Sequence, residues 1–137
     1  MATYTKFQPF VEAICEKKIN LAGTSLTVAL CNAANPPVVG NGTLSQLTQI
    51  AYTNLSSRVL TVDSHAQSGG TFKLVLADLV LTASGSVAPF RYVVIYDDLA
   101  TNDDLIAFWD RGSEVTLENG DTLTLDFDPT NGVLQLA

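Results

Sequence analysis

The most informative stretch of the sequence is Phe90-Arg91-Tyr92-Val93-Val94-Ile95-Tyr96. Its side chains are aromatic, β-branched or amphipathic, and such side chains favour a pleated strand over a helix. Alternate residues of a strand face opposite sides of the sheet, and in this stretch both sides are largely apolar. We therefore expect a central strand that is covered on both faces, which requires two layers of structure.

Short segments with the same alternating pattern occur on both sides of this stretch. The candidate strands are Thr24–Cys31, Arg58–Val62, Thr71–Leu76, Leu79–Ala83, Leu105–Trp109, Val115–Leu117, Thr122–Phe127 and Val133–Leu136. Polar turns such as Ser68-Gly69-Gly70 separate them, and Asn119-Gly120 is typical of a type I′ hairpin turn. Residues 44–52 fit either a helical turn or an edge strand. Eight or nine short strands in 137 residues predict one mainly β domain, an antiparallel β-sandwich of jelly-roll-like type.

One substantial helix is expected near the N-terminus, from about Lys6 to Ile19. Its apolar stripe consists of Phe7, Phe10, Val11, Ile14 and Lys18, which recur at spacings of three and four. Pro9 is compatible only with the first turn, and Gly23 suits the helix end. We expect the stripe to pack on the sheet as a lid, and docking on a neighbouring subunit is the alternative.

The composition indicates a globular chain with an acidic C-terminal part. Hydrophobic residues make up 47% and charged residues 15%, which argues against disorder. The net charge is −7, and residues 97–137 hold ten carboxylates beside the single cation Arg111. Without a basic stripe, direct nucleic-acid binding is not expected. The acidic part is either a solvated surface or a docking face for a basic partner.

The chain shows no pattern of a membrane protein or of an enzyme. No apolar run has the length of a membrane span and no signal peptide is recognised, so we expect a soluble protein made in the cytoplasm. The lone His65 lacks the partners of a catalytic triad. Cys15 and Cys31 are interpreted as buried thiols, with a disulfide or a reactive thiol as alternatives. The segment 126–132 departs from an EF-hand loop, and no catalytic residue, metal site or cofactor is predicted.

Besides the N-terminal segment, residues 1–6, three places are candidates for contacts with a partner. The first is the exposed loop 32–43, rich in turn-forming residues; its candidate contacts are Asn32, Asn35, Pro36, Pro37 and Asn41. The second is the acidic loop, where Asp97, Asp98, Asp103 and Asp104 either form turns or share a cation. The third is Trp109, interpreted as core or as an interface anchor. On the central strand, a partly buried Arg91 would need a carboxylate partner.

Several motifs together resemble a known class of proteins. They are Leu21-Ala22-Gly23 after the opening helix, the segments 67–74 (QSGGTFKL), 89–96 (PFRYVVIY) and 105–112 (LIAFWDRG), and the closing 132–136 (GVLQL). With them the chain resembles the small virion structural proteins of tailed bacteriophages, of the capsid decoration or cement type. The resemblance implies a β-sandwich without catalytic residues. It also implies binding to the major capsid protein on the capsid surface of the virion, as a homo-oligomer. A head-to-tail connector or tail component and a lectin-like binding module are the alternatives.

Overall fold

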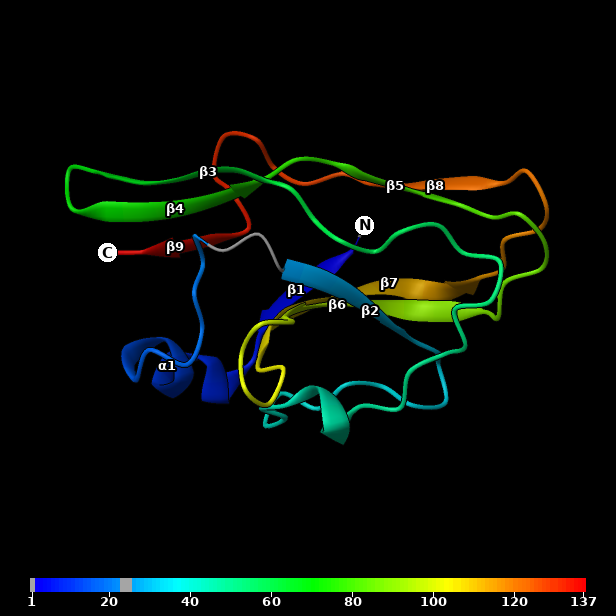
Figure 1. The fold of residues 1–137 in the computed structure, drawn as a ribbon, viewed down its shortest axis with the longest axis horizontal. Coiled ribbons are helices and arrows are strands. Elements are labelled where there is room, and N and C mark those ends of the chain that lie inside the picture. Colours follow the sequence, from blue (N-terminus) through cyan, green and yellow to red (C-terminus); the bar gives the residue numbers. More distant parts are fainter. Residues whose placement is uncertain (1, 23–25) are drawn as a thin grey trace.

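The computed structural model describes residues 2–22 and 26–137, and within them the fold is mainly β with one α-helix (Figure 1). Helix α1 spans Gln8–Cys15, and a 3-10 helix at Leu44–Gln46 shows that the segment 44–52 contains a helical turn. The strands are β1 (Thr3–Lys6), β2 (Leu26–Cys31), β3 (Val62–Ser68), β4 (Thr71–Leu76), β5 (Leu79–Thr82), β6 (Phe90–Asp97), β7 (Leu105–Val115), β8 (Thr122–Leu125) and β9 (Leu134–Leu136).

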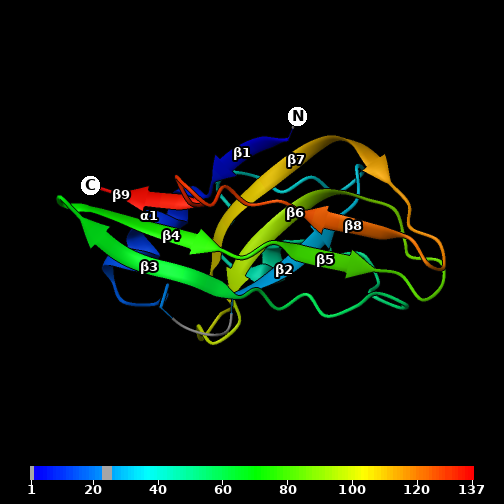
Figure 2. The same cartoon turned by 90° about the horizontal axis from the view of Figure 1, so that it is seen from above.

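The strands form two layers, and all their pairings are antiparallel. One layer is a four-stranded sheet in the order β1-β7-β6-β2, and the other combines the sheets β3-β4-β9 and β5-β8 (Figures 1 and 2). A single cluster of buried side chains joins them, since it contains Leu74 and Leu81 of one layer together with Val94 and Leu105 of the other. The predicted antiparallel β-sandwich with one N-terminal helix is confirmed.

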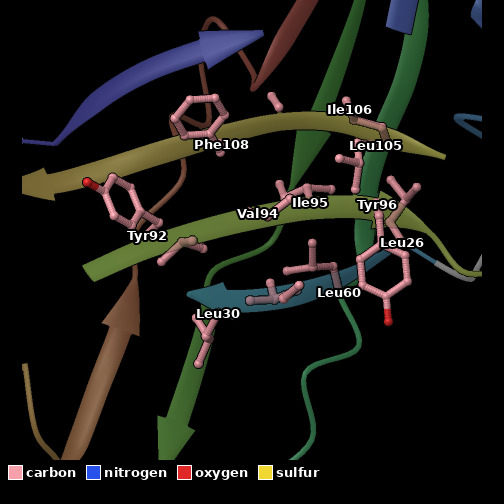
Figure 3. Packing of buried hydrophobic residues seen from close by; sticks show 14 of the residues in the cluster. Leu26, Leu30, Leu60, Tyr92, Val94, Ile95, Tyr96, Leu105, Ile106 and Phe108 are labelled. Atoms are coloured by element: carbon pink, nitrogen blue, oxygen red, sulfur yellow. The ribbon is translucent and has the colours of Figure 1, made fainter. Parts of the chain in front are cut away.

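Strand β6 is the central strand that the sequence predicted. It pairs with β2 on one side and with β7 on the other, and every residue except Arg91 is buried. Figure 3 shows its side chains Val94, Ile95 and Tyr96 among apolar residues of the neighbouring strands. Complete burial of such a side chain contributes about 1.5–3 kcal/mol to stability, so this strand holds the two layers together.

Helix α1 is shorter than predicted and ends at Cys15. Glu16 forms the C-cap, and Lys17 adopts a left-handed conformation with φ +66° that reverses the chain. Gly23, the predicted capping residue, lies outside the described residues. The apolar stripe is also narrower than predicted, because Val11 is 49% exposed while Phe10 is buried.

Two predictions near the C-terminus, one of a strand and one of a hairpin turn, are wrong because strand pairing overrides the local pattern. Strand β7 continues through residues 110–114 to Val115, so the expected separate strand 115–117 does not form. The Asn119-Gly120 turn is not a type I′ hairpin turn, because Gly120 has φ +90° but Asn119 has no positive φ. The strands on either side of this turn pair elsewhere, β8 with β5 and β7 with β6 and β1.

The segment 58–62 is not a regular strand, but it covers the outer edge of β2. It forms one isolated bridge, between Val59 and Thr27, and the N–H of Val28 donates to the carbonyl of Arg58 at 2.9 Å. The Arg58 guanidinium lies 3.6 Å from the centre of the Tyr52 ring. These contacts close one edge of the four-stranded sheet, and the opposite edge is strand β1.

Candidate functional site

The two loops that were predicted as contact elements lie side by side. The chain leaves β2 and runs beneath the four-stranded sheet as loop 32–43, until it reaches the acidic loop 97–104 (Figure 1). There Thr43 and Asp104 form an isolated antiparallel bridge. The two backbone hydrogen bonds of this bridge run from the Leu44 N–H to the Asp103 carbonyl at 3.1 Å and from the Leu105 N–H to the Gly42 carbonyl at 2.9 Å. We call residues 32–43 and 97–104 together the loop surface.

The predicted asparagines of the first loop hold the loop in shape. The side-chain amide of Asn35 donates to the side-chain oxygen of Asn32 at 2.8 Å. The side-chain oxygen of Asn41 accepts the N–H of Val38 at 2.8 Å. Such local bonds favour one loop conformation. The asparagine side chains are thus used within the loop, and other side chains of the loop are the ones available to a partner.

The most exposed apolar side chains of the loop surface were not predicted from the sequence. Val38 is 61% exposed and Leu99 is 76% exposed, whereas the predicted contact residue Pro37 is buried and Pro36 is exposed. Exposed valine and leucine side chains in polar loops give no periodic signal in a sequence. The structure therefore corrects the candidate set at Pro37 and adds Val38 and Leu99.

The acidic loop presents fewer carboxylates than its sequence suggests. Asp97 and Asp104 are buried, and Asp97 accepts the N–H groups of Asn20 at 3.0 Å and Leu99 at 3.1 Å. The bond to Leu99 is a local turn contact, which agrees with the turn interpretation. Within the part of the chain that the structure describes, no group of three or more His, Cys, Asp or Glu side chains is placed to hold a metal ion.

The remaining charge of this loop is concentrated at its tip. Asp98 is exposed and Asp103 is half-buried, with φ +51° at Asp103. Burial raises the pKa of Asp103, and the nearby carboxylates Asp98, Asp104 and Asp97 raise it further. A hollow of about 530 Å³ separates the loop from the end of the helix, where Lys17 and Lys18 line the other side. The tip is thus an acidic patch with lysines beside it.

Trp109 lies apart from the loop surface. Its ring is half-buried and contacts Tyr4 and Phe127, with ring centroids 5.2 Å and 5.7 Å away. It lines a groove of about 790 Å³ between β1 and the segment 126–135, and none of the loop-surface residues lines this groove. We call it the Trp109 groove. Strand β1, which forms one wall, was not predicted, because its short polar sequence is stabilised only by pairing with β7.

The expected partner of Arg91 is present. Its Nε and Nη2 groups donate to the two carboxylate oxygens of Asp110 at 2.7 Å and 3.0 Å. This bidentate pair lowers the pKa of Asp110, and the N–H of Gly112 lowers it further. The pair joins β6 to β7, and both side chains are partly exposed to solvent. We therefore interpret it as a contact between neighbouring strands and not as a buried reactive site.

The other singled-out residues are separated in the fold. Both cysteines are free thiols; Cys31 is buried as predicted, but Cys15 is exposed at the end of α1, so that part of the prediction is wrong. Burial raises the pKa of Cys31 to about 11. His65 lies exposed on β3.

The comparisons with known proteins found no matching family model, no similar curated protein and no similar solved structure. No helix of the described residues is long and apolar enough to cross a membrane.

Proposed function

We propose that this chain is a non-catalytic virion protein of a tailed bacteriophage that decorates the assembled head. It binds the outside of the capsid and reinforces the joints between major capsid subunits. The observation that carries the proposal is the loop surface, in which two loops distant in sequence are joined by the two backbone hydrogen bonds of the Thr43–Asp104 bridge. A binding surface that is already ordered loses less conformational entropy on binding.

The chemistry of the loop surface suits a protein partner. Val38 and Leu99 offer exposed apolar anchors, and the acidic tip at Asp98 and Asp103 favours a basic counterpart. A surface of two loops is small, so a single copy would bind weakly. A homo-oligomer on a capsid symmetry axis would engage several subunits at once, and its high effective concentration would make the sum of these contacts strong.

Binding of this kind stabilises the shell by mass action. A ligand that recognises neighbouring subunits only in their assembled arrangement shifts the equilibrium toward the assembled state. Catalysis is not required for this role, and the proposed protein acts only through its contacts. The major capsid protein is thus the proposed partner, and the capsid surface of the virion is the proposed location.

The test compares two loop-surface variants with a matched control on purified heads that lack the chain. Val38→Ser and Leu99→Ser each remove one exposed apolar side chain, and Val80→Ser removes a 49% exposed valine from β5, outside the loop surface. Exposed substitutions leave stability within about 0.5 kcal/mol, so lost binding would report lost contact. Co-sedimentation with heads should fall for both loop variants and persist for Val80→Ser.

Cryo-electron microscopy of virions gives the independent readout. Density for this sandwich repeated over the capsid exterior, with loops 32–43 and 97–104 against the shell, is the expected result. Density confined to one vertex or to the tail would assign the chain to the connector or the tail instead. Absence from the particle would refute the proposal.

A further inference from the structure

Strand β1 has an open outer edge. The N–H of Phe7 donates to the carbonyl of Ile106 at 3.1 Å, and this bond sets the alternation along the antiparallel pair of β1 and β7. The backbone groups of Thr3 and Thr5 therefore face β7, whereas those of Tyr4 and Lys6 point away from the sheet. No described residue forms a hydrogen bond with these outward groups. In contrast, the segment 58–60 covers the edge of β2 at the other side of the sheet.

The open edge runs along the Trp109 groove. Ala2, Tyr4 and Lys6 all line the groove, so one face of β1 looks into it. A strand added to the edge would place every second side chain on that same face, beside Tyr4 and Lys6 and facing the groove that Trp109 and Phe127 line. Neither the Tyr4 hydroxyl nor the Trp109 indole N–H forms a hydrogen bond with a described residue. The groove can therefore receive both an apolar side chain and a polar one.

The charge of the groove indicates which kind of strand fits. Asp126 and Asp128 line it, and Lys6 is the one cationic side chain among the lining residues. Asp128 accepts hydrogen bonds from the backbone N–H and the side-chain amide of Asn131 and from the N–H of Thr130, and these bonds lower its pKa. Asp126 is exposed and accepts no hydrogen bond from the described residues, so its carboxylate is available to an incoming cation.

We propose that the edge of β1 and the Trp109 groove bind an extended basic segment of another protein, which adds a fifth strand to the four-stranded sheet. The outward groups of Tyr4 and Lys6 would bond to its backbone, an apolar side chain would pack beside Tyr4 in the groove, and a lysine or arginine would meet Asp126. A second copy of this chain is a poor occupant of this edge, because its own β1 would bring the same groove, with Asp126 and Asp128, against the first. The site is distinct from the loop surface, so the proposal does not depend on a role in the virion.

The test is an NMR titration of the ¹⁵N-labelled full chain with a synthetic peptide, acetyl-Thr-Lys-Val-Lys-Val-Lys-Thr-amide. Shifts should be confined to the amides of β1, the Trp109 indole and the segment 126–135. The control peptide carries glutamate in place of each lysine and should cause no shift at the same concentration. Rising salt should weaken binding of the basic peptide.

Two pairs of variants separate backbone pairing from charge. Lys6→Pro removes the outward N–H but leaves the bonds between β1 and β7, as proline on an edge strand can, while Lys6→Ala removes only the side chain. Lys6→Pro should bind about ten-fold more weakly than Lys6→Ala, as expected for one lost hydrogen bond. Asp126→Asn should reduce the salt dependence, and the remote exposed Asp63→Asn on β3 should not. If Lys6→Pro perturbs folding, the unaltered protein is titrated with the basic peptide and with the same peptide N-methylated at alternate residues. N-methylation removes backbone N–H donors of the peptide, so the methylated peptide should bind more weakly.

Several results would overturn the proposal. Equal binding of the acidic peptide would remove the argument from charge, and equal binding of Lys6→Pro and Lys6→Ala would remove the argument from strand addition. Shifts located at β3 or β9 would assign the peptide to another edge. If sedimentation velocity shows a dimer that Lys6→Pro converts to a monomer, the occupant of the edge is a second copy, and the proposed partner is wrong.

Discussion

Replacing Gly132 with alanine should destabilise the protein more than alanine at its other turn glycines. Gly132 has φ +74°, and a Cβ atom placed on it would clash with the carbonyl oxygen of Leu74 on β4. That oxygen also accepts the N–H of Val133 at 2.8 Å, and the Gly132 N–H donates to the Asp128 carbonyl at 3.1 Å. The close atom is backbone, so it cannot move aside without disturbing the pairing of β4 with β9.

The expected loss of stability has two parts, which other glycines separate. A left-handed conformation costs alanine about 1–2 kcal/mol. The contact with Leu74 adds at least one weakened backbone hydrogen bond and a displaced β9, so we expect a total of about 2–4 kcal/mol for Gly132→Ala. Gly120 has φ +90° and open space around its Cβ position, so Gly120→Ala should lose only about 1–2 kcal/mol. Gly40 has neither constraint, and Gly40→Ala should be neutral or stabilising by up to about 1 kcal/mol.

Urea unfolding followed by fluorescence of Trp109, the single tryptophan, measures all three variants. The free energy of unfolding should decrease in the order Gly40→Ala, Gly120→Ala, Gly132→Ala, with unchanged dependence on urea concentration. Equal losses for Gly132→Ala and Gly120→Ala would refute the reasoning, because they would show that the approach to Leu74 carries no energetic consequence.

Three further predictions concern titratable groups. Iodoacetamide at pH 8 should alkylate exposed Cys15 in the native protein and spare Cys31, whose burial raises its pKa to about 11. Peptide mass spectrometry measures both sites, and alkylation of Cys31 in preference to Cys15 would contradict this prediction. Because Arg91 lowers the pKa of Asp110, this carboxylate stabilises the fold at neutral pH, and the stability is lost as the pH falls through the lowered pKa. The melting temperature of Asp110→Asn should therefore lie below that of the parent at pH 7 and approach it in acid. The pKa of Asp103 is raised, so its contribution has the opposite sign: stability is present below its ordinary pKa and lost as the pH rises. Asp103→Asn, which tolerates the left-handed conformation, should melt above the parent at pH 7, and a lower melting temperature would contradict this sign.

Some elements could be predicted from the sequence because their signals are local. The alternation of apolar residues in 90–96 was sufficient to identify β6, and the pattern in 71–76 gave the bounds of β4 as the structure has them. The turn at Ser68-Gly69-Gly70 was recognised since glycine readily adopts positive φ, and both glycines do so. Arg91 also required a partner on chemical grounds alone, and Asp110 supplies it.

Other features depended on contacts between distant parts of the chain. Strand β1 is polar and short, and it is a strand only because β7 extends along it. The Arg58–Val62 prediction failed for a related reason, since the segment covers the edge of β2 by single bonds and the regular strand begins at Val62. β-strand propensity describes a residue's own conformational preference, whereas strand pairing depends on which backbone groups of another segment lie opposite it.

The candidate sites show the same division. Composition and turn chemistry identified loop 32–43, the acidic loop and Trp109 as separate candidates, without indicating which of them meet. Only the tertiary structure joined the two loops through Thr43 and Asp104, buried Asp97 and Asp104, and placed Trp109 in a groove beside β1. The sequence determined the kinds of strand and turn because alternation and glycine conformation act over a few residues. The packing of the two layers decided which segments lie side by side and which side chains are exposed, because burial of apolar side chains outweighs local preference.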